Sequence, residues 1–365
     1  MYKKKIVHII VGLGDGGAER TLYNLVTKDK LNKHFVISLT DHGKYGKNFL
    51  QKKISVYSLG FKKWQPSLIK INKILKIIKK HNPDIIQTWM YHADFITIFL
   101  KIFFPKIKFI WGVRNTVFSI NDSFSRWLVF KLCCLFSHLI PNLIISNSQT
   151  GIDGHKKAGY KNKFKLIYNG VNLKKFNSKK INKKTLSPVI GVVARYDKQK
   201  GYSVLLKSLE ILKNKKNSFY CFCIGKNVNS SNKKLMEEIK ALNLYKNVFL
   251  LGQKKNIENI YKDFDLLVLP SINGEGFPNV IIEAMACGIP CLVTDVGDSK
   301  IIVGKTGWVV PPNNYKKLSQ NLESIFKKIN SPEWRSKKKN CRARVVKKFS
   351  VETMVNNFQK IWNFI

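Results

Sequence analysis

Short apolar runs of strand length alternate with helix-like segments along most of this 365-residue chain. The first set of expected strands covers residues 5–11, 35–40, 85–88, 109–113 and 143–146, with helices expected over 18–28 and 68–80. The second set of expected strands covers residues 189–193, 220–224, 248–250, 266–269 and 290–294. This alternation is typical of parallel sheets that helices cover on both faces. The chain is therefore predicted to be α/β, with two doubly wound, Rossmann-like domains.

A Lys- and Asn-rich segment, residues 165–182, separates the two sets of strands, and the alternation restarts after Pro188. A chain of this length also exceeds what one hydrophobic core normally covers. We expect an N-terminal domain over residues 1–175 and a C-terminal domain over 176–345. Doubly wound sheets bind ligands at the carboxyl ends of their strands, so two such domains facing each other form a binding cleft.

The segment EGFPNVIIEAMACGIP places Glu275 and Glu283 eight positions apart, around a Gly-Phe-Pro turn. A helix is predicted to begin at Asn279 and to run through Ala286, because Gly288 and the proline after it stop a helix. The unpaired N–H groups at the start of a helix favour an anion such as a phosphate. Two carboxylates at this spacing can contact separate parts of one extended ligand.

Cationic side chains follow the first expected strand of the second domain. Arg195 and Lys200 stand there, with Gly201 beside them. Fixed cations lower the barrier for a departing diphosphate by electrostatic stabilisation, and arginine can hold a phosphate with two parallel donors. The sequence has no Asp-x-Asp motif in this context, so we expect no metal ion and no cofactor.

A glycine-rich loop, GLGDGG at residues 12–17, follows the first strand and precedes a helix. It matches G-x-G-x-x-G, and Asp41 lies at the end of the next strand. An NAD-dependent oxidoreductase that uses this loop is therefore an alternative function. That alternative gives no role to Glu275, Glu283 or Arg195, and no group for hydride transfer is apparent.

Five motifs occur in order along nearly the whole chain: GDGGAER at 14–20, TWMYHAD at 88–94, NGVN at 169–172, VAR at 193–195 with KG at 200–201, and the segment from Glu275 to Glu283. Together they resemble retaining, nucleotide-sugar-dependent glycosyltransferases of family 4, which have the GT-B fold and an E-x7-E signature. Within this family, the chain resembles the bacterial enzymes that build surface polysaccharides. The resemblance implies an acceptor-binding N-terminal domain and a nucleotide-sugar-binding C-terminal domain. It also implies that residues 346–365 form a helix that returns to the N-terminal domain.

The same resemblance implies roles for individual residues. Glu283 would hold the ribose hydroxyls, while Glu275 would contact the transferred sugar and phosphate. The other donor-binding residues implied are Gly276, Phe277, Pro278, Asn279, Gly16 and Gly17. The two glycines at 16 and 17 would let the backbone approach the donor phosphate or the acceptor across the cleft, since a Cβ there would clash.

Two further residues of the N-terminal half are candidates for the site. His92 follows the strand that ends near Trp89, and a neutral imidazole there could hydrogen-bond the donor sugar or take the proton of the acceptor. Arg114, in the segment WGVRN, is a candidate for an acceptor phosphate. With Glu275, Arg195 and Lys200, His92 completes the expected catalytic set.

The expected reaction is the retaining transfer of a hexose or N-acetylhexosamine from a nucleoside diphosphate, UDP above all. The expected acceptor is a hydroxyl of a lipid-linked saccharide or a related cell-surface glycan precursor. A catalytically inactive binding scaffold is a further alternative. The intact Glu275, Glu283 and Lys200 argue against it.

The net charge is strongly positive, since 65 Lys and Arg residues face 22 Asp and Glu residues, a balance of +43. Such an excess suggests nucleic acid or an anionic membrane surface as a partner, although a compositional bias toward Lys, Asn and Ile explains it equally well. No nucleic-acid module is recognisable, and we expect no nucleic-acid partner. Residues 66–82 are predicted to form a basic amphipathic helix with an apolar stripe at Leu68, Ile71, Leu75 and Ile78. It could rest on anionic lipid or pack against the sheet with its lysines in solvent.

Two apolar stretches, Phe95–Phe104 and Trp127–Ile145, are too short or too interrupted to span a membrane and are predicted to be buried helix and strand. No secretory signal is recognisable at the N-terminus. The expected location is the cytoplasm, with a peripheral position on the inner face of the cytoplasmic membrane. The seven cysteines match no zinc or disulfide framework and are expected to be reduced core thiols.

Overall fold

The computed structural model describes residues 3–61, 68–114, 124–177 and 187–365, and the chain divides into two compact units. Unit 1 comprises Met1–Gly170 together with Val351–Ile365, and unit 2 comprises Val171–Ser350. The chain thus passes between units after residues 170 and 350, where the sequence had suggested 175 and 345.

Unit 1 is built on a seven-stranded parallel sheet with the order β3-β2-β1-β4-β5-β6-β7. Its strands are β1 (Lys5–Ile10), β2 (Lys33–Ser38), β3 (Ser55–Ser58), β4 (Ile85–Trp89), β5 (Lys108–Val113), β6 (Leu143–Ser146) and β7 (Phe164–Leu166). Its helices are α1 (Gly17–Lys28), α2 (Gly43–Gln51), α3 (Leu68–His81), α4 (Tyr91–Phe103), α5 (Phe124–Phe136), α6 (Gln149–Lys157) and α14 (Val351–Phe364).

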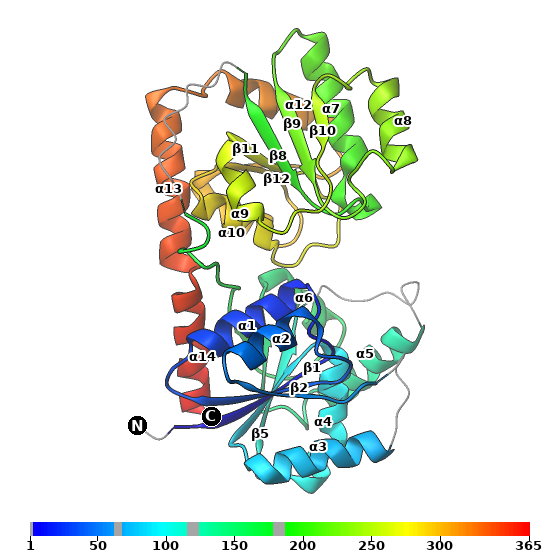
Figure 1. Ribbon diagram of the computed structural model, residues 1–365, viewed down its shortest axis with the longest axis vertical. Coiled ribbons are helices and arrows are strands. Elements are labelled where there is room, and N and C mark those ends of the chain that lie inside the picture. The colour runs from blue at the N-terminus through cyan, green and yellow to red at the C-terminus, as the bar shows by residue number, and fades with distance from the viewer. Residues whose placement is uncertain (1–2, 62–67, 115–123, 178–186) are drawn as a thin grey trace. The chain divides into compact units, whose positions relative to one another are not determined.

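Helices cover both faces of this sheet. One face packs against α1, α2 and α14, and Figure 1 shows the C-terminal α14 beside the N-terminal α1. Phe358 and Trp362 of α14 are fully buried there. The opposite face packs against α3, α4 and α5. The end of the chain therefore completes the core of the domain in which the chain begins.

Unit 2 is built on a six-stranded parallel sheet with the order β10-β9-β8-β11-β12-β13. Its strands are β8 (Val189–Val193), β9 (Tyr220–Ile224), β10 (Val248–Leu250), β11 (Leu266–Leu269), β12 (Cys291–Thr294) and β13 (Trp308–Val310). Its α-helices are α7 (Tyr202–Asn214), α8 (Lys233–Ala241), α9 (Ile257–Ile260), α10 (Asn279–Ala286), α11 (Ser299–Val303), α12 (Tyr315–Phe326) and α13 (Pro332–Lys348). Short 3-10 helices are η1 (Lys198–Lys200), η2 (Tyr261–Asp263) and η3 (Gly304–Thr306).

The two sheets confirm the predicted α/β class with two doubly wound parallel sheets. The strands expected at residues 143–146, 189–193, 220–224, 248–250 and 266–269 are found with the predicted bounds. Three edge strands were not anticipated, β3, β7 and β13. Of these, β7 overlaps the start of the segment that the sequence had suggested as a linker, part of which lies outside the described residues.

The apolar stripe of α3 faces the sheet and not the solvent. Ile74 and Ile78 are buried in the core, and Leu75 and Ile77 pack against it. The exposed side of α3 carries lysines. Of the two interpretations of this helix, the structure therefore supports the one in which its apolar stripe packs on the sheet.

The two apolar stretches form α4, then α5 and β6, as predicted, but they are only partly buried. Several large side chains of α4 and α5 are exposed, among them Ile102, Phe124 and Leu135. None of the helices in the described residues combines the length and the apolar character that a membrane-spanning helix needs. The seven cysteines are free thiols, and all but Cys134 are buried.

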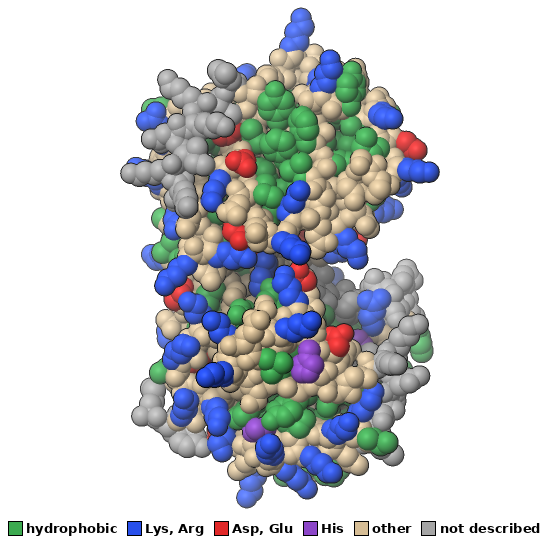
Figure 2. Space-filling model, viewed as in Figure 1, with side chains coloured by type: hydrophobic (Ala, Val, Ile, Leu, Met, Phe, Trp, Pro, Cys, Tyr) green, Lys and Arg blue, Asp and Glu red, His purple; other side chains and the backbone are tan. Residues whose placement is uncertain are grey.

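Positive charge is spread over the surface of both units. On the face that Figure 2 shows, Lys and Arg side chains are scattered over each unit, and Asp and Glu side chains are sparser among them. The excess of 65 basic over 22 acidic residues is therefore not confined to one domain. Charge alone does not single out a binding surface, so a functional surface must be identified by other features as well.

Candidate active site

Both sheets reverse their strand order at one point, between β1 and β4 in unit 1 and between β8 and β11 in unit 2. Loops that leave neighbouring strands on either side of such a point diverge, and the crevice at the carboxyl ends there is where doubly wound sheets bind ligands. In unit 2 the loop after β8 carries Arg195 and Lys200, and the loop after β11 carries Glu275. The topology therefore brings these three residues to one end of one sheet.

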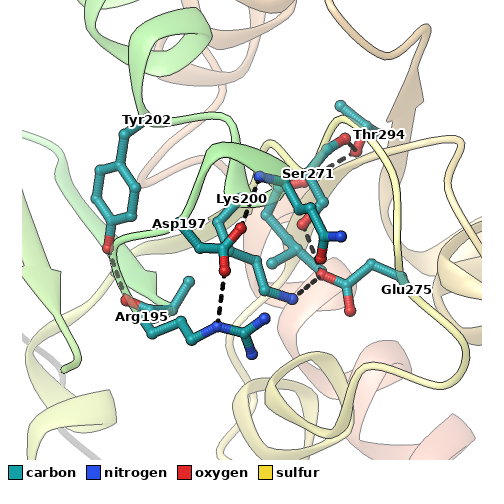
Figure 3. A network of polar contacts seen from close by, with 10 residues as sticks. Arg195, Asp197, Lys200, Tyr202, Ser271, Glu275 and Thr294 are labelled. Carbon is teal, nitrogen blue, oxygen red and sulfur yellow. Dashed lines mark hydrogen bonds and ion pairs between the residues drawn. The ribbon is translucent and has the colours of Figure 1, made fainter. Parts of the chain in front are cut away.

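Lys200 and Glu275 form a largely buried ion pair in unit 2 (Figure 3). The ammonium Nζ lies 2.5 Å from Oε1 of Glu275, with side-chain exposures of 15% and 8%. The hydroxyl of Ser271 donates to the same carboxylate oxygen at 2.6 Å. Thr294, at the end of β12, in turn donates to the carbonyl of Ser271 at 2.6 Å. The carboxylate is thus held in place by residues from three successive loops of the sheet.

Arg195 lies on the more open side of this network and pairs with Asp197. Its Nε donates to Oδ2 of Asp197 at 3.1 Å, and its side chain is 56% exposed. The backbone N–H of Gln199 donates to the other oxygen of Asp197 at 3.0 Å. This backbone hydrogen bond has the largest effect on the pKa of Asp197, which it lowers, and the hydrogen bond from Arg195 lowers it further. Arg195 retains donors on an exposed guanidinium, where an anionic ligand can reach them.

Two glycines allow the loops of this network to approach each other. Gly201 has φ +67°, and a Cβ there would lie 2.0 Å from the carbonyl oxygen of Pro270. Gly297, after β12, has φ +59°, and a Cβ there would lie 2.4 Å from the carbonyl oxygen of Glu275. Neither position tolerates a side chain without movement of the backbone that holds Lys200 and Glu275.

Helix α10 begins at Asn279 and ends at Ala286, which confirms the predicted bounds, and Gly288 follows with φ +77°. Glu283 lies within this helix and is 4% exposed. Its Oε2 accepts from the hydroxyl of Tyr261 at 3.1 Å. The two glutamates of the segment thus have separate sets of hydrogen-bond partners, Lys200 and Ser271 for one and Tyr261 for the other.

The turn that precedes α10 contains three other predicted donor-binding residues, Gly276, Phe277 and Pro278. The carbonyl of Gly276 accepts from the backbone N–H of Asp298 at 2.8 Å. Phe277 is buried and packs edge-on against Phe349. These contacts fix the turn, so that the N–H groups at the start of α10 have a defined direction.

In unit 1, Gly16 and Gly17 lie where α1 begins, after β1. A Cβ at Gly16 would lie 2.2 Å from a carboxylate oxygen of Glu19. Burial raises the pKa of this glutamate, and the nearby Asp15 adds to the increase. The structure thus supplies a local reason for Gly16, the close approach of Glu19 to the first turn of its own helix.

His92 and Asp94 lie in the first turn of α4, beside the carboxyl end of β4. Burial lowers the pKa of His92 to about 4, and the positive charge of Arg126 adds to the decrease. Asp94 is fully buried and accepts from the hydroxyl of Thr88. Burial raises its pKa to about 7. His92 is therefore neutral at pH 7, while Asp94 takes up its proton far more readily than an exposed aspartate does.

Arg114 follows β5, the next strand of the sheet, and its guanidinium lies 4.3 Å from the ring centroid of Trp89. Its Nη1 donates to Oδ1 of Asn169 at 2.8 Å. No described residue accepts a hydrogen bond from its Nε or Nη2. Burial lowers its pKa to about 9, which leaves it charged at neutral pH. It is a cation with two donor atoms that no described residue uses. It lies at the carboxyl ends of the strands beside the switch point, which we call the rim of the unit.

Sequence reasoning missed several residues of the site in unit 2. Ser271, Thr294 and Asp197 orient the cation–carboxylate network, and Tyr261 orients Glu283. Each follows or ends a strand, or lies just before one, which is the signal that could have found them. Among the described residues, no group of three or more His, Cys, Asp or Glu side chains is arranged to hold a metal ion.

Comparison with known families identifies both halves of the chain. Residues 15–175 match the family described as "Glycosyltransferase Family 4", and residues 174–341 match "Glycosyl transferases group 1". The chain is a glycosyltransferase, with a family 4 domain followed by a group 1 domain. The two consecutive matches begin at Asp15, within the glycine-rich loop, and include the segment from Glu275 to Glu283. Membership argues against the oxidoreductase alternative for the loop at residues 12–17.

Full-length relatives and solved structures resemble this glycosyltransferase over nearly its whole length. It is 27% identical over 326 residues to the putative glycosyltransferase EpsF of Bacillus subtilis, and the alignment covers 83% of this chain and 82% of EpsF. It is 28% identical over 325 residues to N,N'-diacetylbacillosaminyl-diphospho-undecaprenol alpha-1,3-N-acetylgalactosaminyltransferase of Campylobacter jejuni, which covers 82% of this chain and 83% of that protein. The crystal structure of Anabaena HepE in complex with UDP aligns with a TM-score of 0.85 and 20% identity, covering 99% and 100% of the two chains. The glycosyltransferase therefore has the GT-B fold.

Proposed function

We propose that this glycosyltransferase moves a hexose or N-acetylhexosamine, with retention of anomeric configuration, from a UDP-sugar to a hydroxyl of a lipid-linked saccharide or related glycan precursor. The observation that carries the proposal is the buried pair of Lys200 and Glu275 at the switch point of unit 2. The pair sets a cation beside a carboxylate where this fold binds a nucleotide, and a sugar diphosphate offers a matching anion and hydroxyl groups.

Unit 2 is assigned the donor. Lys200 and Arg195 would face the diphosphate, whose negative charge grows as the bond to the sugar breaks. Glu275 and the turn over Gly276–Asn279 would contact the transferred sugar, and Glu283 would accept hydrogen bonds from the ribose hydroxyls. Gly16 and Gly17 of unit 1 stay predicted contacts of the donor phosphate. No metal ion is part of the proposal, because the two cations supply the charge that a metal would otherwise provide.

Unit 1 is assigned the acceptor. Arg114 would hold an acceptor phosphate through the donors that no described residue uses. His92 would act as a neutral hydrogen-bonding group, because burial keeps its pKa near 4. In a front-face mechanism the acceptor oxygen bonds to the anomeric carbon while the bond from that carbon to the phosphate oxygen breaks. The acceptor proton then passes to the departing phosphate.

The names of two similar proteins support the chemical class. The Campylobacter jejuni enzyme is named for transfer of N-acetylgalactosamine to a sugar on diphospho-undecaprenol, and HepE was crystallised with UDP. We extend both features to this chain, with a lipid-linked acceptor and a peripheral position at the inner face of the cytoplasmic membrane. A role in the biosynthesis of capsule, lipopolysaccharide or another surface polysaccharide follows from such an acceptor.

A thermal-shift screen with UDP, GDP, ADP and NAD at about 1 mM is the direct test. A ligand at 100 times its dissociation constant stabilises the folded protein by about 2.7 kcal/mol, which is a shift of several degrees for a protein of this size. Selective stabilisation by UDP is the expected result. Stabilisation by NAD alone would overturn the proposal. Stabilisation by GDP alone would mean that the nucleotide of the donor is GDP and not UDP.

A further inference from the structure

The outer surface of the α3, α4 and α5 layer exposes more large apolar side chains than the rest of the described part of unit 1, where Leu31, Leu50 and Phe364 are exposed. All three helices pack on the same face of the sheet, where Ile78, Leu100 and Phe130 are buried among strand residues. Their opposite sides therefore point away from the sheet in the same general direction. What these sides carry decides what the layer can contact.

The apolar patch consists of seven side chains on α4, on α5 and in the turn after α5. They are between 42% and 73% exposed: Phe99, Ile102, Phe103, Phe124, Leu128, Leu135 and Leu139. On α4, Ile102 lies opposite the buried Ile96 and Leu100, and Phe99 lies at their flank. Phe103 lies in the last turn of the helix, on the side of the buried residues, and is exposed there. Soluble proteins usually expose such residues singly, and a gathered set marks an interaction site.

A basic border accompanies the apolar patch. Helix α3 has five lysines, at 70, 73, 76, 79 and 80, and no acidic residue. Exposed cations also flank the patch itself: Lys106, Lys108, Arg126 and Lys131. Between residues 95 and 142 the sequence has a single acidic residue, Asp122. The layer thus joins apolar side chains to positive charge, with very little negative charge between them.

We propose that this layer docks on an anionic lipid bilayer, with the apolar patch inserted at the headgroup boundary and the lysines of α3 over the anionic headgroups. Apolar insertion and attraction of lysines to anionic lipid are the two terms that hold a peripheral protein on a membrane. A second copy docked through this face would bring lysines against lysines, which is costly. The centres of protein interfaces are also depleted of lysine.

The inference rests on the proposed function only for its setting, because a lipid-linked acceptor places the enzyme beside a membrane. The first test measures cosedimentation with vesicles of phosphatidylglycerol and phosphatidylcholine, and with vesicles of phosphatidylcholine alone. We compare wild type with I102Q/F103Q/L135Q/L139Q. The matched control is L50Q/F364Q, which changes exposed apolar residues of α2 and α14 that cover the opposite face. The fourfold variant should bind anionic vesicles about tenfold or more weakly, because four large apolar side chains are lost from the inserted surface, and the control should bind like wild type.

The charge arm compares K73Q/K76Q/K80Q on α3 with K28Q/K30Q/K47Q, which removes the same charge from the α1 and α2 side. Binding by the α3 variant should weaken and lose much of its salt dependence, because exposed charges act through a screened field. The control triple should keep both. Equal losses in the two triples would mean that net charge, and not this surface, governs binding.

Thermal unfolding checks that each variant is folded, and the shift by UDP reports the donor site separately. The docking proposal is wrong if the folded wild-type protein does not bind anionic vesicles. It is also wrong if L50Q/F364Q loses as much vesicle binding as the fourfold variant. A concentration-dependent dimer that only the fourfold variant abolishes, without vesicle binding, would assign the patch to a second copy. Loss of the UDP shift in wild type with vesicle binding intact would overturn the proposed function and leave the docking surface standing.

Discussion

The two sheets share the same strand order around their switch points, yet the side chains at the two rims differ in whether they are ionised. In unit 2 the ion pair of Lys200 and Glu275 is intact and supported by hydroxyl groups. In unit 1 burial suppresses ionisation, since the pKa of His92 is lowered and that of Asp94 is raised. The rim of unit 2 thus keeps an intact ion pair, while the rim of unit 1 combines the neutral His92 with the charged Arg114. In the proposed function the first would face the diphosphate, and the second the acceptor hydroxyl and its phosphate.

The largest expected effect concerns Asp94 in unit 1. Its folded pKa of about 7 lies above its ordinary value of 3.8, so its contribution to stability is fully present below pH 3.8 and is lost as the pH rises through 7. Asp94→Asn removes this term. The free energy of unfolding of the variant, relative to wild type, should rise by about 4 kcal/mol between pH 4 and pH 8.

Urea unfolding at a series of pH values measures this difference. The other titrating groups are common to both proteins, so their contributions cancel when wild type is subtracted. Asp153→Asn, in the exposed part of α6, is the control and should show no such trend. A difference between Asp94→Asn and wild type that does not change with pH would mean that the buried carboxyl ionises normally.

In unit 2, Lys200→Ala should lower turnover by about 100-fold or more, the loss seen when one donor that stabilises developing charge is removed. The control is Lys198→Ala, an exposed lysine two residues earlier in the same 3-10 helix. Steady-state kinetics with a UDP-sugar measure both variants. Because the change also leaves Glu275 without its cation, thermal unfolding must show that the protein remains folded. Wild-type turnover in folded Lys200→Ala would remove this residue from the catalytic set.

The comparison of the rims also explains how far the sequence could lead. Central strands such as β8 and β11 are runs of buried apolar residues, which sequence patterns reveal. The edge strands β3 and β7 have only partly buried or exposed residues, so their short segments carry no comparable pattern. The positions of Glu275 and Lys200 followed from motifs, but the two residues are 75 positions apart in sequence, and their direct pairing depends on β8 and β11 being neighbours in the sheet.

The patch on α4 and α5 shows the same limit at the surface. An apolar stretch such as Trp127–Ile145 predicts burial, yet only one side of α5 faces the sheet. Leu135 is exposed although its neighbour Cys133 is fully buried. Composition could not distinguish a buried helix from one with an apolar outer side, because that depends on which elements cover it.

Glu283→Ala should weaken binding of UDP by about 10- to 100-fold, because a hydrogen bond to a charged group contributes about 1.5–3 kcal/mol. Isothermal titration calorimetry with UDP measures the affinity. Tyr261→Phe removes the hydroxyl that bonds to this carboxylate but leaves the carboxylate in place. It should therefore have the smaller effect. If the two variants bind UDP equally well, Glu283 acts through the packing of α10 and not through the ligand.

The smallest effect is expected at His92 in unit 1, where His92→Gln keeps a hydrogen-bonding group and should lower turnover by about tenfold, at the lower edge of what a positioned side chain contributes. The pH profile decides between its two roles. With a pKa near 4, wild-type His92 is neutral from pH 6 to pH 8, so its ionisation adds no inflection to turnover in that range. An inflection near pH 6.5 in wild type that disappears in His92→Gln would mean that the imidazole is exposed enough to titrate normally and takes the proton of the acceptor. A flat difference between the two profiles would support the neutral hydrogen-bonding role and the contrast between the two rims.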